Sequence, residues 1–72
     1  MNRLREERLR RGWAIVAVTA RCGVAPSTIS AIEVHDYQPT EQTKRRLADV
    51  FDVNVSDIWP GQPASRQEVR LR

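Results

Sequence analysis

Two helical patterns meet at a Gly23-Val24 break, and no other feature limits the possible folds of this chain as strongly. The first pattern covers residues 14–22. It repeats apolar or small side chains at positions i, i+3, i+4 and i+7, which share one helix face: Ile15, Val18, Thr19 and Cys22. We expect Gly23 to end this helix with a positive φ and Val24 to fill the space before the next helix.

The second pattern covers residues 26–33. Pro26 suits the first position of a helix, because its missing N–H has no intrahelical partner there. Ile29 and Ile32 lie three residues apart and are expected to face the core. Short, uncharged side chains occupy the opposite face: Ser27, Thr28, Ser30 and Ala31. Two short helices joined by a tight turn with glycine form a helix-turn-helix, and this small outward face suits close approach to another surface.

The preceding residues 3–11 predict a charged helix that rests on two apolar anchors, Leu4 and Leu9, and ends at Gly12. In this helix acidic residues precede basic ones by four positions, the order that supports a helix surface: Glu6, Glu7, Arg10 and Arg11. Its arginines are interpreted either as a solvated face or as a nucleic-acid contact.

Residues 34–39 predict a loop that turns at His35-Asp36, and Thr40 is expected to N-cap a fourth helix that runs to about residue 52. Residues 53–59 predict a turn and a short fifth helix capped by Ser56. Apolar side chains of this region complete the core: Leu47, Val50, Phe51, Val53, Val55, Ile58 and Trp59. No residues before 60 alternate as a strand would. The predicted fold class is therefore all-α, a compact bundle of five helices with a short C-terminal tail.

A chain of 72 residues is long enough for one small domain, which we place at residues 1–59. Pro60-Gly61-Gln62-Pro63 breaks the helical pattern and begins a tail over residues 60–72. The tail is interpreted as flexible or, because Val69 and Leu71 alternate with arginines, as a strand that pairs across a dimer.

Composition excludes several classes of function. A net charge of +3 and a pI of about 10.0 favour an anionic partner, although residues 13–39 hold one arginine against two acidic residues. Cys22 and His35 are too few soft ligands for a metal site, so no metal and no cofactor are expected. No titratable residues converge at catalytic spacing, so we expect no enzyme. No apolar run reaches the roughly 18 residues of a membrane span and no signal-peptide core is present, so we expect no membrane contact and a cytoplasmic location.

Over residues 3–59 these elements resemble the lambda-repressor-like, Cro/Xre-type helix-turn-helix family. The matching positions run from the first helix to the last: Leu4, Arg8, Gly12, Trp13, Gly23, Val24, Ser27, Thr28, Ile29, Ser30, Ile32, Glu33, Pro39, Thr40, Leu47, Ala48, Val53, Ile58 and Trp59. The resemblance implies a small DNA-binding transcriptional regulator, prokaryotic or from a phage, that acts as a homodimer on double-stranded operator DNA. The same scaffold serves phage repressors, Cro-like switches and antitoxins.

The resemblance also implies roles for individual residues. Helix 26–33 would enter the major groove with four base-facing positions: Pro26, Ser27, Ser30 and Ala31. Phosphates would lie against helix N-termini and the following loop, at these positions: Ala14, Ile15, Thr28, Tyr37, Gln38, Thr40 and Lys44. Arg8 and Glu33 stand where family members carry a structural ion pair.

Three departures from the family pattern bear on function, and one is His35-Asp36-Tyr37 at the turn where the family usually carries glycine followed by basic residues. Ala14-Ile15 replace the polar cap and glutamine with which the second helix usually begins, and helix 26–33 lacks the Arg, Asn or Gln of bidentate base contacts. We therefore expect modest affinity, with DNA shape providing more of the specificity. The alternative hypothesis is a module that docks on a protein partner, without specific DNA binding, through an apolar surface: Ala14, Ile15, Val16 and Ala17.

Overall fold

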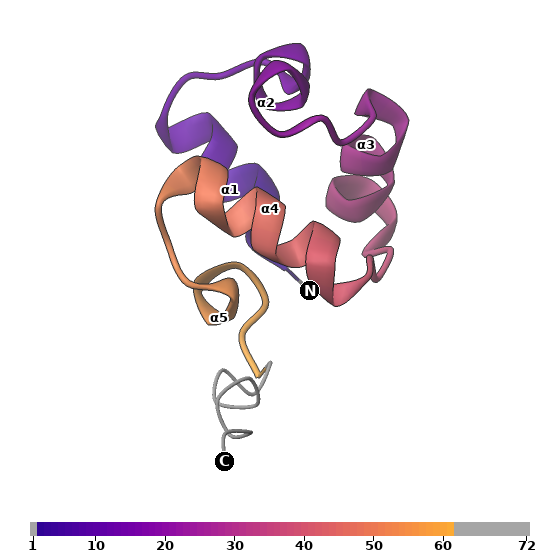
Figure 1. Ribbon diagram of the computed structural model, residues 1–72, viewed down its shortest axis with the longest axis vertical. Coiled ribbons are helices and arrows are strands. Elements are labelled where there is room, and N and C mark those ends of the chain that lie inside the picture. The colour runs from indigo at the N-terminus through magenta and orange to yellow at the C-terminus, as the bar shows by residue number, and fades with distance from the viewer. Residues whose placement is uncertain (1, 62–72) are drawn as a thin grey trace.

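Five helices follow one another along residues 2–61, the residues that the computed structural model describes (Figure 1). In chain order they are α1 (Leu4–Arg10), α2 (Ile15–Cys22), α3 (Pro26–His35), α4 (Glu41–Phe51) and α5 (Val55–Ile58). These residues include no strand, so the expected all-α bundle is confirmed. The two interpretations of Val69 and Leu71 concern residues outside the described part of the chain. Of the helices in residues 2–61, none has both the length and the apolar character needed to cross a membrane.

Helix ends follow local chemistry that the sequence predicted. Gly23 ends α2 at a φ of +78°, and its N–H donates to the Thr19 carbonyl at 2.8 Å. Pro26 occupies the start of α3, where a backbone N–H would have no intrahelical acceptor and its absence loses no hydrogen bond. The Thr40 hydroxyl caps α4 by accepting the Thr43 N–H at 3.2 Å. Gly23, Pro26 and Thr40 are therefore residue types that suit the backbone at these three helix ends.

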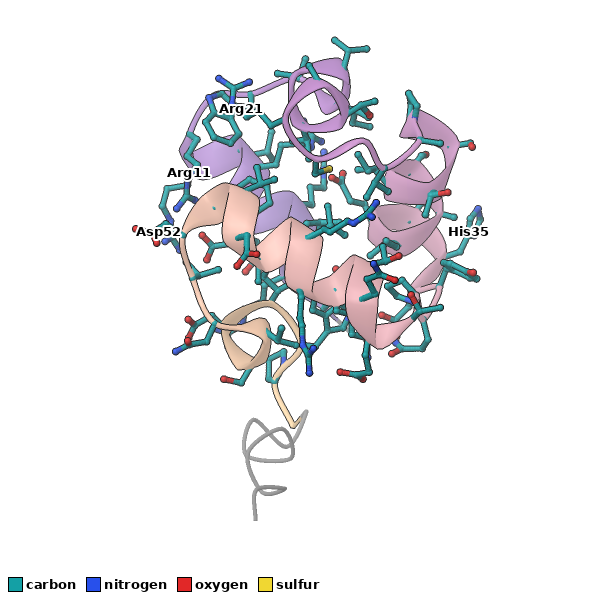
Figure 2. All side chains as sticks on the ribbon, viewed as in Figure 1. Arg11, Arg21, His35 and Asp52 are labelled. Atoms are coloured by element: carbon teal, nitrogen blue, oxygen red, sulfur yellow. The ribbon has the colours of Figure 1, made fainter. Side chains whose placement is uncertain are left out.

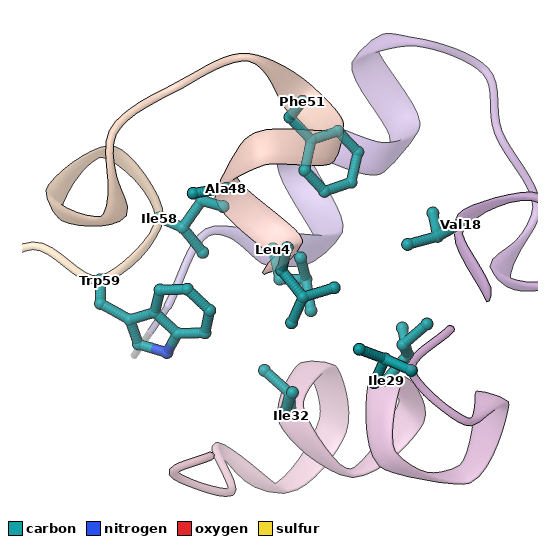
Figure 3. Close-up of a cluster of buried hydrophobic side chains, with 10 residues drawn as sticks. Leu4, Val18, Ile29, Ile32, Ala48, Phe51, Ile58 and Trp59 are labelled. Atoms are coloured by element: carbon teal, nitrogen blue, oxygen red, sulfur yellow. The ribbon is translucent and has the colours of Figure 1, made fainter. Parts of the chain in front are cut away.

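Every helix contributes at least one side chain to a single buried core (Figure 3). The core residues are Leu4, Val18, Val24, Ile29, Ile32, Leu47, Ala48, Phe51, Ile58 and Trp59. Fully burying one large apolar side chain contributes about 1.5–3 kcal/mol. Helices this short are unstable alone in water. Burial in the shared core is thus what holds them, and α4, which crosses the middle of the bundle, packs against both α2 and α5.

The prediction that Leu9 anchors α1 is wrong, because Leu9 is 52% exposed. The buried positions of α1 are Leu4 and Glu7, one turn apart, and Leu9 points away from that face. The buried Glu7 carboxylate is paired, since its Oε1 accepts from Arg11 Nη1 at 2.8 Å. Arg11 Nη2 also donates to the Phe51 carbonyl at 2.6 Å, so this arginine joins the end of α1 to the end of α4 (Figure 2).

Two predicted helix boundaries also differ from the structure. Helix α3 runs to His35, two residues beyond the expected end, and Asp36 stops it in the left-handed region at a φ of 55°. Asn54, not Ser56, is the N-cap of α5. The Asn54 N–H donates to the Asp57 carboxylate at 2.8 Å, which is one half of a capping box that Ser56 has no acidic partner to make.

Candidate nucleic-acid interface

Helix α3 exposes one face while its other face is fixed in the core. Ile29 and Ile32 are fully buried and set the rotation of the helix about its axis. The predicted base-facing positions fall together on the opposite face, where the first two are exposed and the last two are partly exposed: Pro26, Ser27, Ser30 and Ala31. The structure thus brings these four small residues onto one surface of α3.

The expected ion pair between Arg8 and Glu33 is present and bidentate. Arg8 Nε donates to Glu33 Oε2 at 2.8 Å, and Nη2 donates to Oε1 at 2.9 Å. The remaining guanidinium nitrogen, Nη1, donates to the Trp13 carbonyl at 2.8 Å. The two side chains are 11% and 3% exposed, so this is a largely buried pair. The hydrogen bond to Glu33 raises the pKa of Arg8 and keeps the guanidinium charged. One arginine therefore links α1, the start of α2 and the last turns of α3.

A second link to α3 comes from Asn2, which was not among the predicted site residues. Its Nδ2 donates to the Ile32 carbonyl at 2.8 Å and to Asp36 Oδ1 at 2.9 Å, at the C-terminal end of α3. Its Oδ1 accepts the Leu4 N–H at 3.0 Å. An asparagine just ahead of a helix predicts the local bond. The bonds to α3 depend on tertiary packing, and no sequence signal identifies them.

The start of α2 presents backbone, not side chains. Ala14 is its N-cap, and no side chain caps the first turn. The first N–H groups of a helix have no intrahelical acceptor, so those of Ile15 and Val16 are available to an external oxygen. The Ile15 side chain packs against the core, whereas Val16 is 67% exposed. This helix end is therefore an apolar surface with backbone donors at its tip.

The segment after α3 is partly exposed and partly engaged. Tyr37 is 52% exposed and Gln38 is exposed, while Pro39 between them and α4 is buried. The Thr40 hydroxyl is already used at the N-terminus of α4, since it accepts the Thr43 N–H and lies 3.1 Å from the Thr43 hydroxyl. Of these residues, Tyr37 and Gln38 extend exposed side chains, and Gln38 Nε2 donates to the Asp36 carbonyl at 3.4 Å.

Lys44, which is predicted to contact a phosphate, lies at a buried position of α4. The residue is 5% exposed, and its Nζ lies 5.4 Å from the centre of the Trp59 ring and 3.9 Å from Glu41 Oε2. Lys44 sits at an inward position of α4, so its charge faces the indole ring. Thr28, also predicted near phosphates, is partly exposed in the first turn of α3.

The surface formed by α3 and the start of α2 is close to electrically neutral. Glu33 is neutralised by Arg8, and the other two charged residues of 13–39, Arg21 and Asp36, have opposite signs. Long-range attraction of a polyanion depends on a concentrated field of one sign, which this surface does not provide. Short-range fit and backbone donors would therefore have to carry binding. No group of three potential metal ligands occurs within residues 2–61.

Comparison with known proteins identifies this arrangement. A family model described as helix-turn-helix matches residues 4–58, which span α1 to α5 and make up more than half of the chain. No curated protein and no solved structure matches the chain. The matched stretch contains the turn at Gly23, both partners of the Arg8–Glu33 pair and the whole exposed face of α3.

Proposed function

This chain belongs to the Cro/C1-type helix-turn-helix family, and from that membership we propose that it is a small transcriptional regulator whose α3 enters the major groove of operator DNA. The observation that carries the proposal is how the rest of the fold holds α3, which we call its mounting. Its inner face is fully buried, its last turns are clamped by Arg8 and Asn2, and the four predicted base-facing positions of its outer face carry small side chains. A reading helix must hold a defined orientation and approach base edges closely, and this mounting supports both requirements.

The proposed contacts follow from the chemistry of the exposed positions. The hydroxyls of Ser27 and Ser30 can donate to or accept from several bases, and Pro26 and Ala31 can contact thymine methyl groups. The backbone donors at the start of α2 and the side chains of Tyr37 and Gln38 would contact phosphates and set the position of α3 on the duplex. This set includes no bidentate base contact and little charge, so the proposed affinity is modest and depends partly on DNA shape.

We also propose that the regulator acts as a homodimer. One reading helix covers only a few base pairs, whereas two copies related by a two-fold axis read two half-sites about one helical turn apart. The homodimer is the form that binds the operator, and the spacing of the operator half-sites can be measured.

Selection from a random pool of duplexes at low salt, followed by sequencing, tests the proposal. We expect enrichment of a palindrome whose half-sites are centred about 10 base pairs apart. The control is a variant with Arg8→Met and Glu33→Leu, which is first checked to be folded and which lacks the ion pair that holds α3. A pool that stays random through successive rounds with folded protein would contradict DNA reading by α3.

A second candidate function rests on a specific observation at α2. Val16 is 67% exposed beside the exposed Ala14, an apolar surface at which a protein partner could dock. This module would use the same fold without specific DNA binding. Replacing Val16 with Lys distinguishes the two: it would abolish capture of a protein partner, whereas a DNA reader should keep its preferred duplex.

A further inference from the structure

An open pocket of about 390 Å³ lies between the C-terminal end of α2 and the outer side of α4. Five residues line it, and we call them the α2–α4 surface: Arg21, Cys22, Arg46, Asp49 and Val50. None of them belongs to the proposed DNA-binding face. We propose that two copies of this chain pair through the α2–α4 surface about a two-fold axis. The inference names the interface of the homodimer invoked above and rests on that proposed function.

The charges of the α2–α4 surface fit a second copy of the same surface. Arg46 and Asp49 are both exposed and lie one turn apart on α4. Within residues 2–61 their side chains form no ion pair with each other or with a neighbour, whereas the buried carboxylates of Glu7 and Glu33 are both paired. In a two-fold interface, residue i of one copy meets residue j of the other and the reverse also holds. An axis that passes between the two positions, with the α4 helices antiparallel, places Arg46 of each copy opposite Asp49 of the other.

The remaining residues give this surface an apolar part beside the charged pair and a fixed edge. Cys22 and Val50 are half-buried, pack against the core and still line the pocket. Arg21 is held at the edge by its stacking on Trp13 and by donating from Nη1 to the Ala17 carbonyl at 3.0 Å (Figure 2).

A small anion fits the pocket less well than a second copy does. Two arginines would attract an anion, but the Asp49 carboxylate lines the same pocket and would repel it. A second copy pairs with both charges at once, because its Asp49 lies opposite Arg46 of the first copy and its Arg46 lies opposite Asp49.

Charge reversal with mixing tests the inference on the full chain, by sedimentation equilibrium without DNA from micromolar to millimolar concentration. We expect the wild type to dimerise, and Arg46→Asp and Asp49→Arg each to weaken dimerisation about tenfold or more, because each change turns two attractive pairs into repulsive ones. Mixing the two variants should restore dimers, since every 46–49 pair in the mixed species again has opposite charges. Arg5→Asp on α1 makes the same charge change on an exposed residue away from this surface and should leave the dimer unchanged.

The outcomes separate this inference from the proposed function. A wild type that stays monomeric at millimolar concentration overturns the inference, and so does a dimer that both reversals leave intact. Reversals that dissociate the dimer without rescue on mixing also overturn it. Rescue on mixing supports the interface even if selection from random duplexes finds no operator, in which case the DNA-reading proposal alone fails.

Discussion

Replacing Arg8 with methionine removes one partner of the buried ion pair that fixes α3, and the cost can be estimated from its geometry. The change leaves the Glu33 carboxylate, 3% exposed, without both of its guanidinium bonds and leaves the Trp13 carbonyl without a donor. Removing one partner of a buried pair costs about 3–5 kcal/mol, because the other charge stays buried and uncompensated. A folded unit of this size has a total stability of roughly 3–9 kcal/mol. Arg8→Met should therefore bring the domain close to unfolding.

The double change Arg8→Met with Glu33→Leu should recover most of that loss. Well-packed apolar residues often replace a buried pair at no net cost. The Trp13 carbonyl still lacks its donor, which costs about 1–3 kcal/mol. We expect the double variant to lie within about 2 kcal/mol of the wild type. Glu33 raises the pKa of Arg8, so the charged guanidinium stabilises the fold at all pH values below the ordinary arginine pKa. Its contribution is lost only as pH rises through the raised value, and the order of the variants should not change near neutral pH.

Urea unfolding followed by circular dichroism and tryptophan fluorescence measures these differences. The two signals should change together, which is the condition for reading a free energy of unfolding from them. A loss below about 1 kcal/mol in Arg8→Met would refute the reasoning, because the pair would then behave as a surface salt bridge. A double variant as unstable as the sum of both single changes would refute it equally, since independent side chains show no coupling.

Three further predictions concern single residues; the first two use the same unfolding measurement, and the third uses a titration of duplex DNA. Gly23→Ala should cost about 1 kcal/mol, because the new Cβ meets nothing within 4 Å and only the φ of +78° is unfavourable, and Gly23→Asn should cost less. Thr40→Ala should cost about 1 kcal/mol through loss of the bond to the Thr43 N–H, and a stability equal to the wild type would count against that cap. Lys44→Met should change affinity for duplex DNA by less than about twofold, because the lysine faces Trp59, and a general loss of affinity would support its phosphate role.

The sequence predicted the helices well where one local rule decides the outcome. The spacing of Ile15, Val18 and Cys22, with the glycine that follows, placed α2 within one residue of its observed start. Pro26 and Thr40 marked the starts of α3 and α4 for equally local reasons, a missing N–H and a hydroxyl acceptor. The Arg8–Glu33 pair came instead from family resemblance, since nothing local relates two residues 25 positions apart.

The sequence was less informative where a residue far away along the chain determines which side chain is buried. Glu7 is buried in place of Leu9 because Arg11 pairs with it and also reaches the Phe51 carbonyl on α4. The burial of Lys44, whose phosphate contact stays a prediction, likewise involves a distant residue, Trp59. Periodicity within one helix identifies a face but not which charged residue on it has a partner elsewhere. The base-facing set on α3 remains a proposal, although its burial pattern agrees with the role.

The central claim is that Ser27 and Ser30 on α3 read bases, and an anisotropy titration tests it most directly. A selected duplex and a permuted duplex of the same composition are titrated with the wild type and with the variant Ser27→Ala/Ser30→Ala. A single neutral hydrogen bond contributes about 0.5–1.5 kcal/mol, so the two hydroxyl contacts together are worth about 1–3 kcal/mol. The ratio of the two affinities should therefore fall about tenfold or more in the variant, while affinity for the permuted duplex changes little. Ser56→Ala in α5 should leave the ratio intact. An unchanged ratio in the double variant, or an equal loss of affinity for both duplexes, would contradict base reading by α3.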